Sequence, residues 1–179
     1  VAWLTESSGA RLMFCNAAFP DHAAACGVTT LVFGEAGFGP SVQAITAEHW
    51  GSRPQVAVVD RDDPCWFFFT SGTTGRPKAS VLTHGQMAFV VTNHLADLMP
   101  GLTGDDASLV VAPLSHGAGV HQLTQVARGV KTVLLPTERF DAAQVWDLVR
   151  EWRVSTMFTV PTILKLLVEH PATVAADTS

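Results

Sequence analysis

Several features that would mark a particular class of protein are missing from the 179 residues. There is no tyrosine, and charged residues make up only 15% of the chain, with a net charge of −5. So mild an acidic excess gives no reason to expect nucleic acid or an anionic membrane surface as a partner. The three cysteines (Cys15, Cys26 and Cys65) contain no CxxC pair, so they indicate neither a zinc site nor a disulfide framework. Because free thiols in an apolar chain are typical of a reducing compartment, we expect a cytoplasmic protein.

Long hydrophobic runs are also missing. Hydrophobic residues make up 47% of the chain and the mean hydropathy is +0.26, but no uninterrupted apolar run has the ~18 residues of a membrane span. The chain opens on Val1 with "VAWLTESSGA", which is typical of the last turns of a helix and lacks the regions of a signal peptide. We therefore interpret the chain as an excerpt of a longer protein. Its uncovered apolar faces should make the excerpt self-associate.

The order of apolar segments predicts the fold class. Strands are predicted at 11–15, 30–33, 56–59, 65–70, 80–83, 108–112, 132–135 and 155–159. Helices are predicted at 21–26, 41–50, 85–99, 119–127, 142–152 and 162–170. Runs that are apolar on both strand faces, such as 67–69, 109–111 and 133–135, are typical of strands covered on both sides. The alternation predicts a layered α/β fold with largely parallel sheets and helices on both faces. A subdomain division is possible near 100–106.

Two residues are predicted to begin helices. Asp141 should cap the helix at 142–152, because a carboxylate at this position accepts hydrogen bonds from free backbone N–H groups. Pro161 suits a first helical turn, where its missing N–H costs nothing.

The stretch "TSGTTGRPK" at 70–78 follows an apolar strand and combines glycines, hydroxyls and two cations. No carboxylate occurs between Asp63 and Asp97, so Arg76 and Lys78 are the only charges in that window. Glycines let successive backbone N–H groups converge on an anion, and the hydroxyls add donors. A solvated turn is the simpler alternative, but so many suitable residues favour a polyphosphate site. The predicted phosphate-binding residues are Thr70, Ser71, Gly72, Thr73, Thr74, Gly75, Arg76 and Lys78.

Two other nucleotide-binding motifs do not match. A Walker A loop needs a glycine where Pro77 stands, which makes a P-loop NTPase a poor alternative. The remaining glycine cluster, Gly34, Gly37 and Gly39, has the wrong spacing for a dinucleotide fingerprint.

The sequence also gives no support for a serine hydrolase or for a metal site. Neither Ser71 nor Ser115 lies in a G-x-S-x-G nucleophile elbow. His116 and His121 are five residues apart without an acidic partner, which is poor spacing for metal ligands, and we expect no metal site within the chain.

A second motif, "VVAPLSHGAG" at 110–119, places His116 in a turn after a doubly apolar strand. Ligands of open α/β sheets bind at the carboxyl ends of strands, and imidazole is accessible in both protonation states near neutral pH. We therefore predict that His116 faces a ligand. The other six histidines (His22, His49, His84, His94, His121 and His170) are interpreted as structural or surface residues.

These stretches together resemble the adenylate-forming (AMP-binding) superfamily, which includes acyl-CoA synthetases, 4-coumarate-CoA-type ligases, luciferases and peptide-synthetase adenylation domains. "TSGTTGRPK" resembles its signature phosphate loop, and "VLTH", "VVAPLSHGAG" and "FDAAQVWDLVREWRVSTMFTVPTILKLL" resemble its following segments in chain order. Ala79 departs from the usual glycine, which would stiffen the loop exit without disabling it. The resemblance implies that 1–179 is a partial N-terminal domain of an acyl-CoA synthetase-like fold.

The resemblance also implies the roles of residues. The residues of 70–78 would hold the β and γ phosphates of ATP, with Lys78 and Arg76 offsetting their charge. Lys78 and His116 are the implied catalytic residues, since His116 would border both the acyl carboxylate and the nucleotide. The implied acyl-pocket residues are His116, Gly117, Ala118, Gly119 and Val120. The implied reaction activates a carboxylic acid, fatty or aryl, to an acyl-adenylate with ATP and transfers the acyl group to CoA.

Other parts of such an enzyme are not found between Val1 and Ser179. These are the tyrosine-glycine-threonine-glutamate motif near adenine and Mg²⁺, the ribose-binding aspartate, the hinge, and the C-terminal lid domain with its lysine. We therefore expect most Mg²⁺ ligands to lie outside this chain and expect the chain alone to be inactive. The alternative function is a non-catalytic nucleotide- or phosphate-binding module. The acid, and the choice between CoA and another thiol, stay open.

Overall fold

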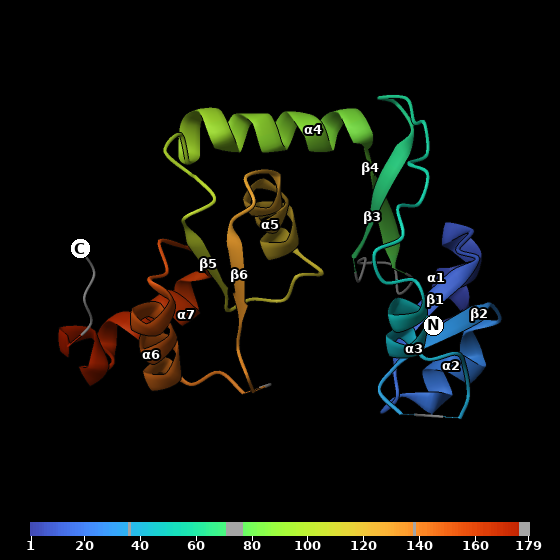
Figure 1. Ribbon diagram of the computed structural model, residues 1–179, viewed down its shortest axis with the longest axis horizontal. Helices are drawn as coiled ribbons and strands as arrows, with labels where there is room; N and C mark the ends of the chain where they lie inside the picture. The colour runs from blue at the N-terminus through green and yellow to red at the C-terminus, as the bar shows by residue number, and fades with distance from the viewer. Residues whose placement is uncertain (36, 71–76, 138, 176–179) are drawn as a thin grey trace. The chain divides into compact units, whose positions relative to one another are not determined.

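The protein is described by a computed structural model that covers residues 1–35, 37–70, 77–137 and 139–175 (Figure 1). The chain divides into two units, residues 1–58 and 59–179, and each is described by itself. The stretch 100–106 lies inside the second unit, and a further subdomain division there stays a prediction.

The first unit is built on two parallel strands. Its elements are α1 (Ala2–Ser8), β1 (Leu12–Asn16), α2 (Pro20–Cys26), β2 (Thr29–Phe33) and α3 (Val42–Glu48). Cys15 of β1 lies opposite Val32 of β2, and both are buried together with Cys26 of α2. On the other face the rings of Phe14 and Phe33 lie 5.9 Å apart and remain exposed. Strand alternation therefore gives this small sheet one covered and one uncovered apolar face.

The predicted strand at 56–59 is wrong. Residues 52–60 form no regular secondary structure, and Val56 and Val58 are 86% and 99% exposed. Apolar alternation makes a strand only where another strand offers backbone partners. This segment crosses the boundary between the two units, and no strand of the described residues pairs with it.

The second unit begins with an antiparallel hairpin, which is the exception to the predicted parallel pairing. Its strands are β3 (Pro64–Thr70) and β4 (Lys78–Thr83). The pairing register shifts between Pro64 and Trp66, so Cys65 is the extra residue of a bulge. Cys65 is exposed, whereas Cys15 and Cys26 are buried.

A helix leads from the hairpin to the next sheet. α4 (His84–Asn93) begins with a capping box in which Thr83 and Gln86 bond each other's backbone N–H groups. It continues as the π-helical turn η1 (His94–Leu98), where the sequence predicts α-helix to residue 99. An α-helix and a π-helix place apolar residues at nearly the same spacing over a stretch of only five residues. The sequence pattern therefore cannot distinguish the two.

A three-stranded parallel sheet forms the centre of the second unit. Its elements are β5 (Ala107–Val110), α5 (Gly117–Ala127), β6 (Lys131–Leu134), α6 (Ala142–Trp152), β7 (Thr156–Phe158), α7 (Pro161–Glu169) and the 3₁₀-helix η2 (Pro171–Ala175). The strand order is β6-β5-β7, with β5 in the middle. Helices cover both faces as predicted: Gln122 of α5 donates to Thr132 of β6 (2.6 Å), and α6 and α7 pack on the other face.

Of the three described strands predicted to be buried on both faces, only the middle strand of the parallel sheet, β5, is buried in this way. Ala107, Ser108 and Leu109 of β5 are all buried. Phe67 in the hairpin and Leu134 on the edge strand β6 are 37% and 60% exposed, so the predicted double burial of those strands is wrong for the described chain. The sequence runs are equally apolar, but among the described strands β5 alone has a neighbouring strand on each side.

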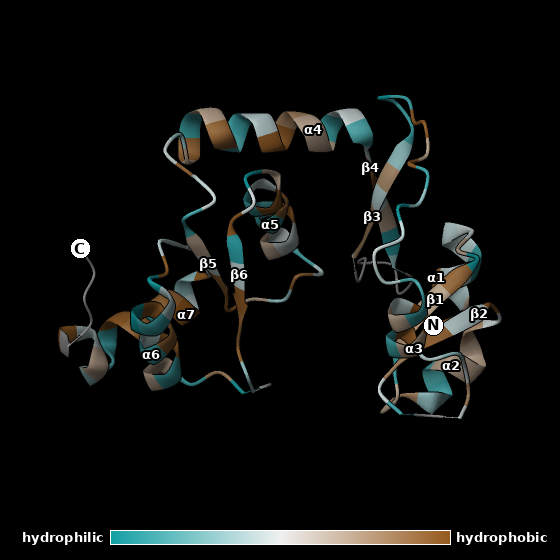
Figure 2. Ribbon diagram, viewed as in Figure 1, coloured by the Kyte–Doolittle hydropathy of each residue, from teal (hydrophilic) through white to brown (hydrophobic). Residues whose placement is uncertain are grey.

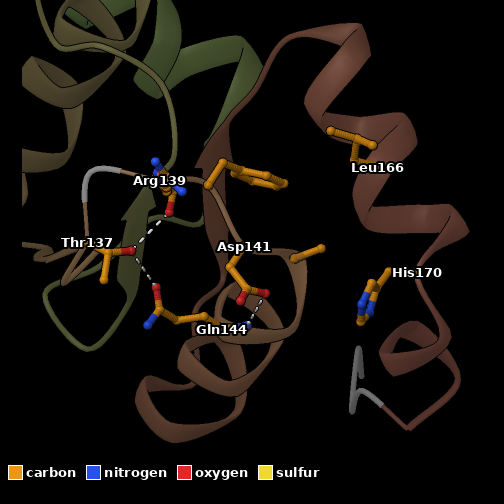
Figure 3. Close-up of a pocket in the computed structure, with 8 residues that line it drawn as sticks. Thr137, Arg139, Asp141, Gln144, Leu166 and His170 are labelled. Carbon is orange, nitrogen blue, oxygen red and sulfur yellow. Dashed lines mark hydrogen bonds between the residues drawn. The ribbon is translucent and has the colours of Figure 1, made fainter.

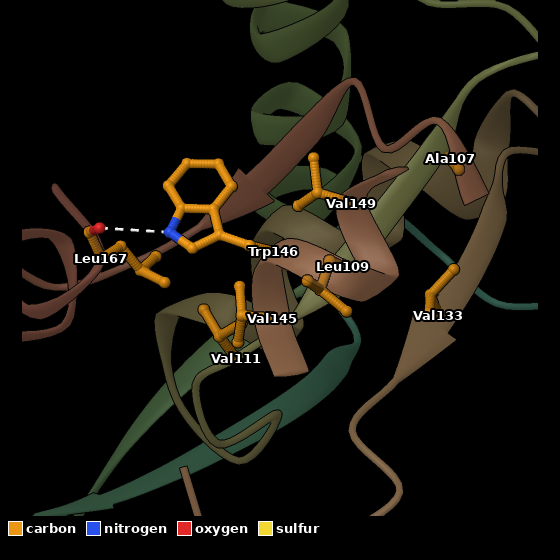
Figure 4. Close-up of a cluster of buried hydrophobic side chains, with 8 residues drawn as sticks. All are labelled: Ala107, Leu109, Val111, Val133, Val145, Trp146, Val149 and Leu167. Atoms are coloured by element: carbon orange, nitrogen blue, oxygen red, sulfur yellow. Dashed lines mark hydrogen bonds between the residues drawn. The ribbon is translucent and has the colours of Figure 1, made fainter. Parts of the chain in front are cut away.

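The core of the second unit joins the sheet to α6 and α7 (Figure 4). Its buried members are Ala107, Leu109, Val111, Val133, Val145, Trp146, Val149 and Leu167. The indole Nε1 of Trp146 donates to the carbonyl oxygen of Leu167 at 3.2 Å, which ties α7 to α6. Full burial of one such side chain contributes about 1.5–3 kcal/mol, so this cluster is the main source of stability here.

The opposite side of α7 is apolar and uncovered. Leu164, Leu166 and Val168 are 51%, 49% and 60% exposed, and α7 is coloured mainly as hydrophobic in Figure 2. Nowhere in the described ranges is a helix both long enough and apolar enough to cross a membrane.

Replacing Asp141 tests the cap of α6. The carboxylate accepts from the backbone N–H groups of Ala143 (2.8 Å) and Gln144 (3.3 Å), as the sequence predicts. We expect Asp141→Ala to lower the free energy of unfolding by about 1 kcal/mol in urea titrations, because both donors lose their acceptor. Asp147→Ala, which removes only an exposed ion pair with Arg150, is the control and should cost less. Equal losses would contradict the capping role.

Candidate active site

The two ends of the predicted phosphate loop meet at the tip of the hairpin. Thr70, the last residue of β3, lies opposite Lys78, the first residue of β4, and its hydroxyl donates to the Lys78 carbonyl oxygen at 3.5 Å. Both residues are exposed. The other predicted phosphate-binding residues, Ser71, Gly72, Thr73, Thr74, Gly75 and Arg76, lie outside the described residues. Strand pairing thus holds the two ends of this motif together.

His116 occupies a turn between β5 and α5. Its backbone N–H donates to the carbonyl of Pro113 (3.2 Å), and its own carbonyl accepts from the N–H of Gly119 (2.9 Å). The imidazole is exposed and makes no hydrogen bond to the helix that it precedes. The backbone is therefore fixed at the carboxyl side of the sheet while the ring stays accessible. A ligand-facing role for His116 stays a prediction.

Gly119 allows the hairpin to pack on α5. A β-carbon at this position would collide with the carbonyl oxygen of Leu114 and lie 3.0 Å from Cη2 of Trp66. Trp66 in turn stacks on Phe68, with ring centroids 4.9 Å apart. Residues 66, 68 and 70 share one face of β3, because side chains alternate along a strand. Thr70 therefore lies on the hairpin face that carries the contact with α5.

Gly117 makes a second close approach, to β7. A β-carbon here would lie 2.9 Å from Cζ of Phe158, the last residue of β7. Gly117 is exposed, whereas Ala118 and Gly119 are buried and Val120 is half-buried. The structure thus brings the predicted acyl-pocket residues onto two aromatic rings, Trp66 and Phe158. A pocket-lining role for these residues stays a prediction.

Behind Phe158 lies a polar cluster that contains His94 and His121, two of the histidines interpreted from the sequence as structural or surface residues. The His121 ring lies 5.7 Å from that of Phe158 and 6.2 Å from that of His94. The fully buried Gln125 places its amide nitrogen 3.1 Å from Nε2 of His121 and 3.3 Å from Sδ of Met99. Burial, and then the nearby His94, lower the pKa of His121 from its ordinary value. The helical spacing 117, 121, 125 is the signal that could have linked these residues to the His116 turn.

A separate pocket of about 920 Å³ lies between the loop after β6 and α7 (Figure 3). It contains none of the predicted site residues. Its polar groups already serve the fold: Thr137 donates to the Arg139 carbonyl and to Gln144, and Asp141 caps α6. No group of three or more His, Cys, Asp or Glu that could hold a metal occurs among the described residues. The His116 edge and the hairpin tip remain the better candidate site.

The sequence model of one protein family, described as "AMP-binding enzyme", matches residues 1–179. The chain belongs to the AMP-binding enzyme family. Family membership confirms the resemblance on which the assignments at 70–78 and 110–119 rest. It leaves the role of each residue to be tested.

Curated relatives of this AMP-binding family member are acid ligases. A feruloyl-CoA synthase of Amycolatopsis sp is 38% identical over 129 residues, 71% of this chain and 26% of the relative. An indoleacetate–CoA ligase of Aromatoleum aromaticum is 30% identical over 78% of this chain and 27% of the relative. The fatty acid–[acyl-carrier-protein] ligase ScoC of Streptomyces coeruleorubidus is 32% identical over 99% of this chain and 34% of the relative. The chain thus spans about a quarter to a third of the relatives it matches.

Solved structures agree with the fold of this family. The amide bond synthetase McbA of Marinactinospora thermotolerans matches with a TM-score of 0.78 at 22% identity, over 98% of this chain and 34% of that protein. The N-terminal domain of FACL13 from Mycobacterium tuberculosis matches with a TM-score of 0.77 at 25% identity, over 98% of this chain and 44% of that domain. The predicted α/β class and the N-terminal domain assignment of the fold are confirmed.

Adding one methyl group at Gly119 tests the contact between hairpin and helix. We expect Gly119→Ala to lower the free energy of unfolding in urea by about 1–3 kcal/mol, because the Leu114 carbonyl is backbone and cannot move aside cheaply. The control is Gly101→Ala, since a β-carbon there would meet no atom within 4 Å. Equal stability of the two variants would show that Trp66 and α5 do not pack this closely.

Proposed function

We propose that the complete protein activates a carboxylic acid with ATP to an acyl-adenylate and then passes the acyl group to CoA as a thioester. The observation that carries this proposal is the pairing of Thr70 with Lys78, which joins the ends of "TSGTTGRPK" in a member of the AMP-binding family. Residues 1–179 supply part of the N-terminal domain, and a C-terminal lid domain belongs to the rest of the protein. A cytoplasmic location follows from the thiol content and stays a prediction.

Lys78 and the loop before it bind the triphosphate. The Lys78 ammonium is exposed at the hairpin tip, where it is free to approach an anion from solvent. With Arg76 it offsets the negative charge on the β and γ phosphates, and the Thr70 hydroxyl adds a donor on the β3 side. Such fixed charges also stabilise the charge that develops on departing pyrophosphate.

His116 lies where the acyl carboxylate meets the nucleotide. A carboxylate oxygen of the acid attacks the α-phosphorus of ATP, and the bond from that phosphorus to the bridging oxygen breaks as pyrophosphate leaves. The CoA thiol then gives up its proton to solvent as its sulfur attacks the acyl carbon, and AMP leaves with the electron pair of the acyl–phosphate anhydride bond. The chain contributes by holding the reactants in the geometry of the reaction. Such positioning accounts for a large part of catalysis in two-substrate reactions.

Magnesium does not fit the residues present here. Mg²⁺ is usually held by one or two carboxylates together with substrate phosphates. The sequence has no carboxylate from residue 64 to residue 96, and the described residues contain no acidic cluster that could hold a metal. Its protein ligands would come from outside this chain, and no step above depends on them.

Fatty or aryl acids are the substrates we favour. Small residues at 117–119 leave the aromatic rings of Trp66 and Phe158 as neighbours of the proposed acyl pocket, which suits an apolar group. No aspartate stands in 110–119 to pair with the ammonium of an amino acid. Relatives named for ferulate, indoleacetate and fatty acids support the same classes. CoA is the acceptor we propose, although one relative is named for a carrier protein.

Acid-dependent exchange of pyrophosphate into ATP tests adenylate formation. The complete gene product would be assayed with a panel of fatty, aryl and amino acids. We expect exchange with a fatty or aryl acid, and a fall in kcat/KM of about 100-fold or more in Lys78→Ala, the range for removing one charge-stabilising donor. Lys165→Ala is the matched control, because that lysine makes only an exposed ion pair with Glu169 on α7. The 179-residue chain alone should show no exchange.

A complete protein that binds ATP but shows no exchange with any acid would contradict the enzyme. It would leave the alternative, a non-catalytic nucleotide-binding module. An equal loss in Lys78→Ala and Lys165→Ala would instead contradict the role of the hairpin tip.

The isolated chain should self-associate through α7. Leu164 and Val168 are four residues apart, so they share a helix face, and both are more than half exposed. We expect light scattering to give an apparent mass above the monomer's 19.1 kDa that rises with concentration. The double variant Leu164→Glu, Val168→Glu should remain closer to the monomer mass. A concentration-independent monomer mass for the unmodified chain would contradict this prediction.

A further inference from the structure

A row of side chains connects η1 to the first turn of α5. His94 of η1 is in edge contact with His121 of α5, His121 lies against Phe158 of β7, and Phe158 fills the space beside Gly117. His94 is itself fixed, with Nδ1 2.9 Å from the carbonyl of Val90. Gly117 directly follows His116. The row therefore ends at the turn on which the proposed reaction depends.

We propose that His121 is a positioning residue: its neutral ring holds Phe158 against Gly117 and so fixes the His116 turn at the carboxyl edge of the sheet. The proposal rests on the proposed function for the part that concerns catalysis. The part that concerns the structure of the His116 turn can be tested whether or not the protein is an active enzyme.

The neutrality follows from Gln125. Its amide nitrogen only donates, so Nε2 of His121 accepts at 3.1 Å and the ring carries its single proton on Nδ1. A proton on Nε2 would face that donor, close to a second imidazole, in a half-buried site. The arrangement shown is therefore compatible only with the neutral ring.

Gln125 also offers an alternative arrangement. Its Oε1 is buried and has no hydrogen-bond partner among the described residues, which costs free energy. Turning the amide over would bring Oε1 to an Nε2 that carries a proton, in the charged ring or in the neutral Nε2–H tautomer, but would give up the contact with Met99 Sδ. Protonation of His121 would therefore move the amide rather than add a bond to the existing arrangement.

Few charged groups lie near enough to His121 to affect its protonation. The elements packed on α5 are α4, η1, β6 and β7, together with β3, whose Trp66 lies beside Gly119 and whose one titratable residue is Cys65. The titratable residues of the other elements are His84 of α4, His94 and Asp97 of η1, and Lys131 of β6. Only His94 acts on the pKa of His121, and the Lys131 ammonium lies over the Trp152 ring instead. The protonation of His121 should therefore depend mainly on its burial and on the neighbouring His94.

The direction of the pH effect follows from the lowered pKa. The unfolded chain takes up the proton near the ordinary value of 6.5, and the folded chain does so only at lower pH. The stabilising contribution of the neutral ring is thus fully present above pH 6.5. It is lost as the pH falls through the folded-state pKa.

Two variants in the complete protein separate the parts of this proposal. His121→Phe keeps a ring against Phe158 but cannot accept from Gln125 or take up a proton. His121→Asn keeps an acceptor but has no ring. The control is His22→Phe, because His22 is an exposed histidine stacked on Phe19 in the first unit (5.3 Å). Basal activity should be unchanged in the control.

Hydrogen exchange at fixed pH 7.5 tests the structural claim. We expect amides of 117–120 to exchange about threefold to tenfold faster in both His121 variants, the effect of losing one net hydrogen bond or its equivalent in packing. Amides of α6 should be unchanged. When the unmodified protein is taken to pH 5.5, its α5 amides should lose protection relative to those of His121→Phe at the same pH. Unchanged exchange at 117–120 in both variants would overturn the proposal.

Pyrophosphate exchange tests the catalytic claim. We expect kcat to fall about tenfold to 100-fold in His121→Phe, as for a misplaced reacting group, with the KM for ATP unchanged because the hairpin tip is untouched. The acidic limb of the kcat–pH profile that depends on His121 should disappear in this variant. A retained limb with unchanged kcat would overturn the catalytic claim. If the unmodified protein shows no exchange with any acid, the proposed function and this claim both fail, while hydrogen exchange still decides the structural one.

Discussion

The absence of a side chain at Gly119 is the constraint on which the candidate site depends. Because only a hydrogen stands there, Trp66 of β3 reaches α5 and the Leu114 carbonyl passes close to the helix. The hairpin that carries Thr70 and Lys78 and the helix that follows His116 are thereby set against each other. Neither the strand pairing of the hairpin nor the core around Trp146 would achieve this alone, since they stabilise separate parts of the second unit.

Much of this fold can be predicted because its local signals agree with its packing. Helix α6 matches its predicted bounds of 142–152, since its apolar spacing, the Asp141 cap and the core against β5 all favour the same helix. Pro161 likewise begins α7. The phosphate-loop and His116 motifs stand out by their residue types and spacing and by their family resemblance, and the roles of their residues stay predictions. The structure adds that Thr70 and Lys78 are strand partners.

The remainder depends on contacts between distant residues. Segment 56–59 has the alternation of a strand, but pairing requires a free strand edge that the sequence cannot reveal, and the segment is exposed and forms no regular secondary structure. The packing of Phe158 on Gly117 joins residues 41 positions apart, and His94, the first residue of the π turn, meets His121 of α5. The sequence therefore indicates only separate structural or surface histidines, whereas the structure places His94 and His121 in a shared environment.

The bulge at Cys65 has a practical consequence. Of the three thiols it alone is exposed, and it is the extra residue beside Trp66. A maleimide dye should therefore attach to the native chain at a single position, without cysteine engineering. The label would lie on the strand that leads to the predicted phosphate-binding motif, one residue from the indole that contacts α5. A dye whose emission depends on its surroundings would then report on the hairpin while nucleotide is added.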